Sequence, residues 1–238
     1  MSTYVLVHGA WHGGWCWHKI VARLEAEGHT VIAPDMPGHG RDPRPIEPVT
    51  LGDIVGKIHE TIDAQAEPVI LVGHSYGGAM ITQAAEQRSD KIKSLVYVTA
   101  FLLDDGQSVM KLAEQDSESR LTGQVDVSPT GDTMTVKPEV VRDCFYAQCS
   151  DEDVAYSLPR LGPEAISGLR TPMQTSTSRF GRLRRYYVEC LKDNAISPGL
   201  QKKLYSALPC ERVFSLNTDH SPFFSAPDAL AGILTSLG

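Results

Sequence analysis

The chain lacks the features that would assign it to several large classes of protein. No apolar run in its 238 residues approaches the roughly 18 residues needed to cross a membrane, so no transmembrane helix is predicted. Its five cysteines are odd in number and show no Cys-x-x-Cys spacing, which argues against a disulfide framework or a zinc site. We expect them to be reduced and mostly buried. Basic residues are outnumbered, 22 to 29, giving a net charge of -7, which argues against nucleic acid as a partner.

The first residues do not predict a secretory leader. Met1, Ser2 and Thr3 run directly into an apolar stretch, without the basic and then apolar segment of a signal peptide. The hydrophobic content of 42% and charged content of 21% are typical of a globular protein. We therefore expect a cytoplasmic protein, monomeric or homodimeric, that does not associate with membranes.

Apolar runs alternate with helical periodicity through both ends of the chain. Strands are predicted at 4–7, 30–33, 69–72, 94–99, 186–191 and 212–216, and helices at 15–27, 51–64, 79–87, 198–207 and 227–237. The strands are almost continuously apolar, which is typical of a parallel sheet covered on both faces. We predict a doubly wound, mostly parallel α/β sheet. Ligands bind such sheets at the carboxyl ends of the strands, where His8, Asp35, Ser75 and Thr99 fall.

This alternation stops after Phe101 for about eighty residues. Residues 121–136 predict a hairpin that turns at 128–131, and short helices are expected near 139–146 and 152–160. No parallel strand is indicated here. We therefore predict one domain, in which 1–102 and 183–238 form the core and 103–182 are inserted as a cap.

The sequence Gly73-His74-Ser75-Tyr76-Gly77 links an apolar strand to a helix of small residues. The pattern Gly-x-Ser-x-Gly in this context is typical of a nucleophile elbow, a sharp turn that exposes a serine at the end of a strand. Side chains at the two flanking positions would collide with the neighbouring strand and helix, and glycine removes the collision. Ser75 is the predicted nucleophile.

A serine nucleophile needs a histidine base and an acid that orients the base, and in this topology the chain order is serine, acid, histidine. His220 is the one histidine after His74, and it follows the last predicted strand directly. We predict that His220 is the base.

The acid has more than one candidate. Asp193 follows the strand at 186–191, in a loop at the same edge of the sheet, and is favoured. Asp104 and Asp105, after the strand at 94–99, are the alternatives. Asp219 is adjacent to His220 in the chain and could hardly reach the ring of its own neighbour.

The oxyanion formed at the attacked carbonyl needs preorganised hydrogen-bond donors. In this topology they are the backbone N–H of the residue after the nucleophile, Tyr76, and one N–H from the loop after the first strand, for which Ala10 is predicted. His8 is predicted to hold that loop by side-chain hydrogen bonds. The remaining histidines are expected to be ordinary polar residues: His12, His18, His29, His39 and His59.

Four motifs give the chain a family resemblance: V-L-V-H-G-A-W-H-G-G-W-C-W at 5–17, E-G-H-T-V-I-A-P-D at 27–35, G-H-S-Y-G-G at 73–78 and D-H-S-P-F at 219–223. With them the chain resembles the α/β-hydrolase branch of the plant methylesterases, which includes the salicylic-acid-binding methylesterase, the hydroxynitrile lyases and bacterial esterase relatives. The resemblance covers essentially the whole core and implies an α/β-hydrolase fold. Family members carry the nucleophile, acid and base at the positions matching Ser75, Asp193 and His220.

The resemblance implies a serine carboxylesterase that works through an acyl-enzyme, with no metal or organic cofactor. A hydroxynitrile lyase is the first alternative, but the lyases have a threonine in place of Gly9 and a lysine in place of Ser221. The second alternative is a hydrolase-fold protein that binds a ligand and turns it over slowly.

The substrate is expected to be a small, mostly hydrophobic ester. Apolar residues are spread through the cap, and Trp11, Phe145 and Tyr146 are predicted to contact the substrate. Other apolar residues expected around the pocket are Met110, Leu112 and Phe180 from the cap and Tyr76 from the core.

Overall fold

Six parallel strands form the main sheet of the protein, in a computed structural model that describes all 238 residues. The order across the sheet is β2-β1-β3-β4-β8-β9, so the chain starts near the middle and winds outward in both directions. The strands are β1 (Thr3–Val7), β2 (Thr30–Ile32), β3 (Val69–Ser75), β4 (Ile92–Ala100), β8 (Arg185–Cys190) and β9 (Arg212–Leu216).

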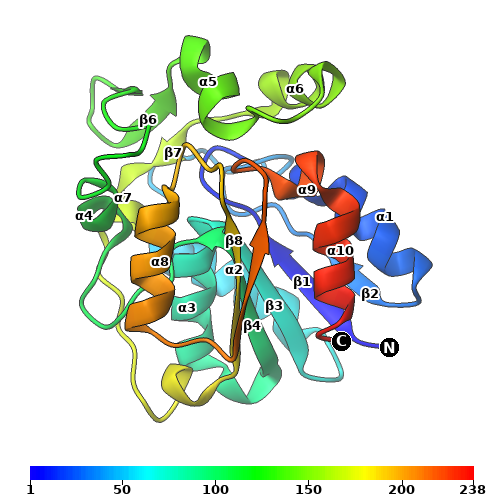
Figure 1. Cartoon of the computed structure of the whole chain (residues 1–238). Coiled ribbons are helices and arrows are strands. Elements are labelled where there is room, and N and C mark those ends of the chain that lie inside the picture. Colours follow the sequence, from blue (N-terminus) through cyan, green and yellow to red (C-terminus); the bar gives the residue numbers. More distant parts are fainter.

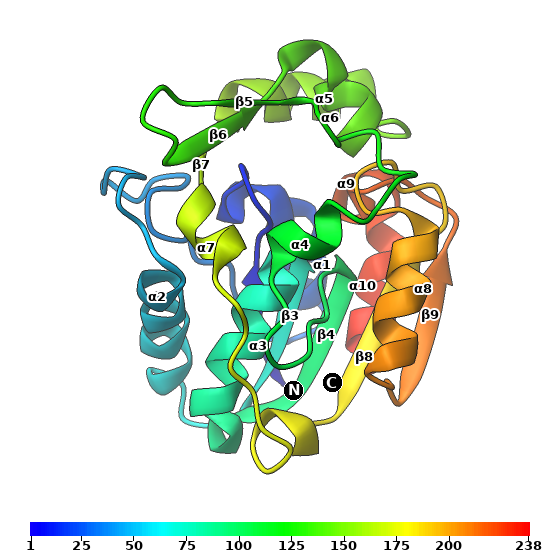
Figure 2. The same ribbon diagram turned by 90° about the vertical axis from the view of Figure 1, so that its left-hand side faces the viewer.

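Helices cover both faces of this sheet (Figures 1 and 2). On one face lie α1 (His18–Ala26) and α10 (Pro227–Thr235), and on the other α2 (Leu51–Asp63), α3 (Gly77–Gln87) and α8 (Pro198–Ala207). All seven residues of β3 are buried, because a central strand between two helical layers has no exposed face. The predicted doubly wound sheet is confirmed.

Several element boundaries differ from the sequence-based prediction. The helix expected at 15–27 begins as a 3-10 turn, η1 (Gly14–Trp17), before α1. The strand that carries Ser75 does not stop at residue 72, because Gly73 and His74 still pair with β4. Strand β8 ends at Cys190, so Leu191 lies outside it. Helix α2 starts as predicted at Leu51, and the preceding Thr50 forms a capping box with Asp53.

A second, antiparallel sheet lies in the cap, which sits over the carboxyl ends of the main strands (Figure 1). Its strands β5 (Val125–Val127) and β6 (Thr133–Val136) form the predicted hairpin, and β7 (Glu164–Ala165) pairs with β6. The short helices here are α4 (Val109–Ala113), α5 (Pro138–Phe145), α6 (Asp151–Ser157) and α7 (Ile166–Arg170), with 3-10 turns η3 (Leu158–Arg160) and η4 (Phe180–Arg182). Elsewhere the chain forms η2 (Ser89–Lys91) and α9 (Pro222–Ser225).

The cap and the sheet share one apolar core. A single cluster of 62 buried residues includes both main-strand residues such as Leu71 and cap residues such as Phe145. Every main-sheet strand lies outside 103–182 and every cap strand inside it. The division at these two positions stays a prediction.

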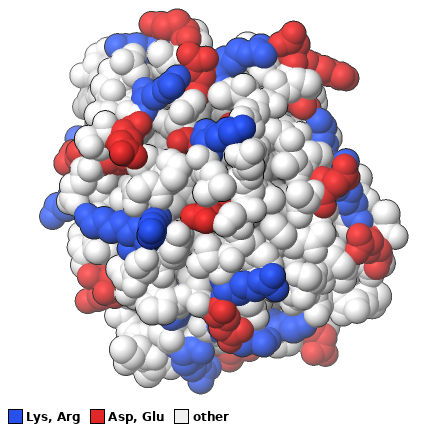
Figure 3. Space-filling view, in the orientation of Figure 1, with Lys and Arg blue, Asp and Glu red and all other residues white.

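The surface carries charges of both signs. On the face in Figure 3, Lys and Arg side chains alternate with Asp and Glu, and no large patch of one sign forms. None of the helices combines the length and the apolar character needed to cross a bilayer. All five cysteines are free, and four of them are buried.

Candidate active site

Ser75 stands on a strained turn between β3 and α3. Its φ of 54° lies in the left-handed region, which a residue with a Cβ rarely adopts. Glycine is needed on both sides of it: a Cβ at Gly73 would come 2.5 Å from the carbonyl oxygen of Gly77, and one at Gly77 would come 2.7 Å from the carbonyl oxygens of Val7 and His8. The local geometry is that of the predicted nucleophile elbow.

The structure brings Asp193 and His220 together across 27 residues of chain. Nδ1 of His220 lies 2.6 Å from Oδ2 of Asp193, and both side chains are buried. Because a carboxylate only accepts, Nδ1 carries a proton and donates it to Asp193. The other ring nitrogen, Nε2, has no hydrogen bond to the protein and faces the pocket that Ser75 also lines. This tautomer is the one that a general base requires.

The carboxylate of Asp193 accepts four hydrogen bonds. Its Oδ1 accepts the backbone N–H groups of Ala195, at 2.6 Å, and Ile196, at 2.9 Å. Its Oδ2 accepts the hydroxyl of Thr99 in addition to His220. These bonds leave the carboxylate one orientation.

The rival acids lie elsewhere. Asp104 and Asp105 are exposed, and their carboxylates accept backbone N–H groups of Asp105 and Thr175. Asp219 is buried but makes no hydrogen bond to the ring of His220. It accepts the backbone N–H of Gln148 at 2.7 Å and the hydroxyl of Ser225 at 2.7 Å, and so fixes the loop that carries His220.

Two buried residues beside Ser75 have unpaired backbone N–H groups. Ala10 and Tyr76 both line the pocket beside Ser75, and neither of their N–H groups donates to a protein acceptor. Unpaired buried N–H groups are rare in native structures, since each costs about the energy of a lost hydrogen bond. Because both residues line the pocket that Ser75 also lines, a ligand bound there can accept hydrogen bonds from their N–H groups.

Three non-glycine residues have φ above zero, and all of them are at this site: Trp11 at 63°, Ser75 at 54° and Thr99 at 38°. Trp11 follows the Ala10 donor, and Thr99 donates to Asp193. Strained backbone collects at functional sites because the surrounding structure holds it there.

Buried histidines surround the elbow. Nδ1 of His8 donates to the Gly9 carbonyl, and its Nε2 accepts the N–H of Met36, so His8 holds the loop after β1 as predicted. His74 donates from Nε2 to the carbonyl of His220, 2.7 Å away. Burial, and then neighbouring histidines, lower the pKa of both His8 and His74, so each ring is neutral.

The expectation that His12, His39 and His59 are ordinary polar residues is wrong, because all three are buried. Nδ1 of His12 bonds to the Ala10 carbonyl at 2.8 Å, and its Nε2 bonds to the Tyr146 hydroxyl at 2.7 Å. Burial lowers the pKa of His12 to about 4. His12 is therefore neutral and connects the loop of Ala10 to the cap.

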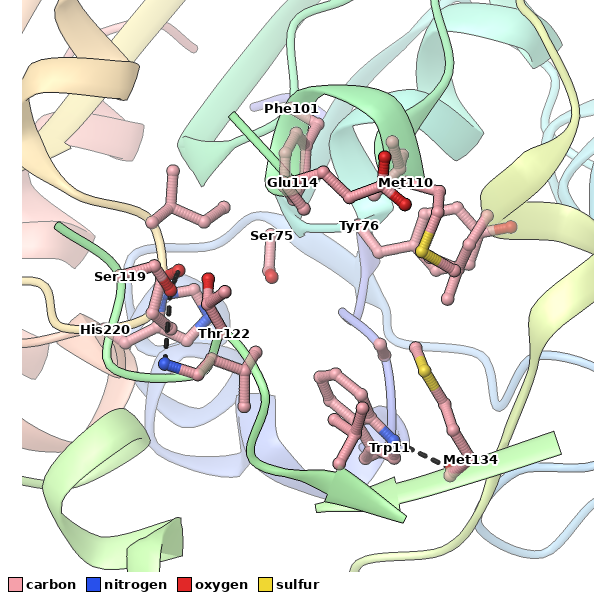
Figure 4. A pocket seen from close by; sticks show the side chains of 18 of the residues that line it. Trp11, Ser75, Tyr76, Phe101, Met110, Glu114, Ser119, Thr122, Met134 and His220 are labelled. Atoms are coloured by element: carbon pink, nitrogen blue, oxygen red, sulfur yellow. Dashed lines mark hydrogen bonds between the residues drawn. The ribbon is translucent and has the colours of Figure 1, made fainter. Parts of the chain in front are cut away.

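The pocket between sheet and cap has a volume of about 180 Å³ and a mostly apolar wall. Figure 4 shows Ser75 near its centre, with His220 on one side and Tyr76 on the other. The indole of Trp11 donates to the carbonyl of Met134 at 3.0 Å and stacks on Phe145, with ring centroids 5.7 Å apart. The apolar lining includes Trp11, Phe101, Met110, Met134, Phe145 and Ile196.

Not all of the predicted pocket residues reach the cavity. Tyr146 lies behind Phe145, and its hydroxyl is bonded to His12, so it does not line the pocket. Leu112 and Phe180 are also absent from the wall; the ring of Phe180 lies under the guanidinium of Arg185. The periodicity of short cap helices could not show which side each residue would face.

Glu114 is the one charged residue, apart from the titratable His220, in the lining of the pocket. It follows α4 and is exposed at the rim, while Ser119 and Thr122 add hydroxyl groups. No lysine or arginine faces the cavity. No sequence pattern indicates this carboxylate, because its segment has no clear periodicity.

Comparison with known proteins agrees with this geometry. Residues 4–233 match the model of the alpha/beta hydrolase family. The chain therefore belongs to the α/β-hydrolase family.

Several similar proteins are named as esterases or hydrolases. It is 32% identical to the putative chloroplastic methylesterase 11 of Arabidopsis thaliana, over 99% of this chain and 64% of that protein. Polyneuridine aldehyde esterase superposes with a TM-score of 0.92 at 26% identity, covering 100% and 99% of the two chains. A pyrethroid hydrolase from Sphingobium faniae JZ-2 superposes with a TM-score of 0.88 at 25% identity, covering 99% and 96%. These names support ester hydrolysis at the level of the family.

Proposed function

We propose that the protein is a serine carboxylesterase that hydrolyses small, mostly hydrophobic esters through an acyl-enzyme. The observation that carries this proposal is that one cavity brings together a serine, a histidine and two unpaired backbone amides. The cavity is lined by Ser75, by a histidine oriented through Asp193, and by the two unpaired amides of Ala10 and Tyr76.

The reaction follows from these positions. Oγ of Ser75 attacks the ester carbonyl while Nε2 of His220 takes its proton, and the amides of Ala10 and Tyr76 stabilise the negative oxygen. The intermediate collapses when His220 returns the proton to the leaving alcohol, which leaves an acyl group on Ser75. A water molecule then attacks the acyl carbonyl, gives its proton to His220, and releases the carboxylic acid. Asp193 stabilises the imidazolium in both halves.

The lyase alternative fits this site poorly. A Cβ at Gly9 would lie 2.8 Å from the Cβ of Ser75, so the loop leaves no room for the threonine of the lyases. Ser221 is fully buried, and its hydroxyl has no partner and no charge. Departing cyanide would lack the cation that offsets its charge, which is worth roughly 1.5 to 3 kcal/mol.

We expect a burst of p-nitrophenol when the enzyme is mixed with p-nitrophenyl acetate, followed by steady turnover. The burst reports acylation of Ser75, and the steady phase reports hydrolysis of the acyl-enzyme. Mass spectrometry of the quenched reaction should find the acyl group on the peptide that contains Ser75. A protein that binds the ester but gives neither acylation nor turnover would support the ligand-binding alternative and contradict the esterase proposal.

We also expect neutral esters to be preferred over anionic ones. The pocket offers no cation, and the Glu114 carboxylate at its rim repels a negative substrate. At an exposed rim this repulsion is about 1 kcal/mol, or roughly fivefold in kcat/KM. Ethyl butyrate and monoethyl succinate form a suitable pair, and Glu114→Gln should narrow the difference between them. A preference for the anionic ester would contradict the prediction.

A further inference from the structure

A buried ion pair is hydrogen-bonded to Trp11, the residue after Ala10, and takes no direct part in the reaction described above. Nε2 of His39 lies 3.1 Å from Oε2 of Glu164, and the exposed fractions of the two side chains are 1% and 0%. His39 belongs to the loop after β2, whereas Glu164 belongs to cap strand β7. A buried pair of this kind costs several kcal/mol in desolvation for each charge, which its attraction and hydrogen bonds must offset.

The hydrogen bonds of His39 indicate that its ring is charged. Nδ1 faces the carbonyl oxygen of Pro37 at 3.1 Å, and Nε2 faces Glu164, so both nitrogens meet acceptors. Only the imidazolium donates from both. His8 and His12, by contrast, each meet one donor and one acceptor, as a neutral ring requires.

The charged groups around His39 favour the same state. Burial lowers the pKa of His39, but the adjacent Glu164 carboxylate, its hydrogen bond, the Pro37 carbonyl and the more distant Asp35 together raise it above the usual value. The other titratable groups near the ring are His8, 5.3 Å away between centroids, and His12, and burial keeps both neutral. They therefore add no positive charge against His39.

Glu164 also holds the backbone of the loop that carries Ala10. Its Oε2 accepts the N–H of Trp11 at 3.2 Å, and the neighbouring Gly162 donates its N–H to the Trp11 carbonyl at 3.0 Å. Trp11 is thus fixed on both sides in its left-handed conformation by one segment of the cap. The peptide group that contains the Trp11 N–H begins at the Ala10 carbonyl. Fixing Trp11 therefore also restricts the backbone orientation of Ala10.

The same cap segment touches the second donor residue. A Cβ at Gly168 in α7 would fall on the hydroxyl of Tyr76, so that only glycine fits against this ring. Strand β7 and helix α7 together therefore contact Tyr76 and Trp11, the residue that follows Ala10.

We propose that His39 and Glu164 are positioning residues: the pair fixes the cap strand β7 against Trp11 and so holds the Ala10 N–H in its orientation toward the oxyanion. This inference rests on the proposed esterase function. According to this inference, the cap residue Glu164 helps to stabilise the transition state without touching the substrate. Its effect passes through the backbone of Trp11 and Ala10.

The test compares kcat and KM of two Glu164 variants and one control variant with those of the wild type. Glu164→Gln removes the charge but keeps the shape, and Glu164→Asp keeps the charge but withdraws it from Trp11. Losing one oxyanion donor lowers kcat about 100- to 1000-fold, so a misaligned donor should lower it about 10- to 100-fold. KM should change by less than about threefold, because the ester is bound before the oxyanion forms.

Glu86→Gln is the matched control. Glu86 in α3 also joins core to cap, through the N–H groups of Ser176 and Phe180, but it does not line the pocket. Its kcat should remain within about twofold of the wild type. An equal loss in Glu86→Gln would overturn the proposal, because it would trace the effect to general loosening of the cap.

Hydrogen exchange supplies a readout that does not need turnover. The Trp11 amide should exchange faster in Glu164→Asp than in wild type and in Glu86→Gln, with thermal unfolding used to confirm that each variant is folded. Unchanged kcat or unchanged Trp11 exchange in a folded Glu164 variant would overturn the positioning role, as would a rise in KM alone. If Glu164→Gln does not fold, Glu164→Asp carries the test. Absence of ester turnover in the wild type would instead contradict the esterase proposal. The exchange rates of the Trp11 amide would still show whether His39 and Glu164 hold this loop.

Discussion

Ser75→Ala should abolish ester turnover almost completely, lowering kcat by about four to six orders of magnitude. Without Oγ there is no nucleophile and no acyl-enzyme, and the remaining rate depends on direct attack by water in a pocket that still binds the ester. Steady-state hydrolysis of p-nitrophenyl acetate measures the loss, and the initial burst should vanish with it.

Stability provides the control for this variant. The Ser75 hydroxyl makes no hydrogen bond within the protein, so its removal should change the free energy of unfolding by less than about 1 kcal/mol. Ser94→Ala is a matched substitution, since the Ser94 hydroxyl in β4 is buried without a partner and lies away from the pocket. Turnover in folded Ser75→Ala within about tenfold of that of Ser94→Ala would assign the nucleophile to another residue.

Asp193→Asn should lower kcat by about 10⁴-fold. The two N–H groups of Ala195 and Ile196 point at Oδ1, so an asparagine must place its oxygen there and turn its NH₂ toward His220. Nδ1 of His220 then becomes the acceptor, and its proton moves to Nε2, where the base must be unprotonated. The imidazolium also loses its counter-charge. The dependence of kcat on pH measures the catalytic loss, and circular dichroism checks that the variant is folded.

Asp104→Asn and Asp105→Asn are the controls for the acid. Both carboxylates are exposed and bonded to local backbone, so kcat should stay within about twofold of the wild type. A large loss of kcat in either variant, with kcat of Asp193→Asn nearly unchanged, would show that the acid is in the loop after β4.

Local sequence patterns predicted the parts of the site that depend on local geometry. The elbow requires glycine at 73 and 77 because the colliding atoms belong to the turn itself or to the adjoining strand, and the sequence records both glycines. The order of serine, acid and histidine narrowed the base to His220, and the structure brings Asp193 to its ring. The parallel sheet was predictable because its buried strands are continuously apolar.

Contacts between distant segments were not predictable. His39 and Glu164 are 125 residues apart, and β7, which carries Glu164, is two residues long and leaves no periodic signal. Tyr146 is predicted to line the pocket as one of the apolar residues of the cap, yet the end of α5 turns its hydroxyl toward His12. Which of two neighbouring aromatic residues reaches a cavity depends on packing, and packing is a property of the folded chain.

The close approach of α7 to Tyr76 limits how this scaffold could be re-engineered. Exchanging caps between relatives is an attractive route to new substrate ranges, because the cap supplies much of the pocket wall. Here a transplanted cap that lacks glycine at position 168 would push on the Tyr76 ring and shift the residue next to the nucleophile. Cap and core are therefore closely fitted to each other at this contact. A cap exchange should keep residues 162–168 of the host protein and replace only the rest of the cap.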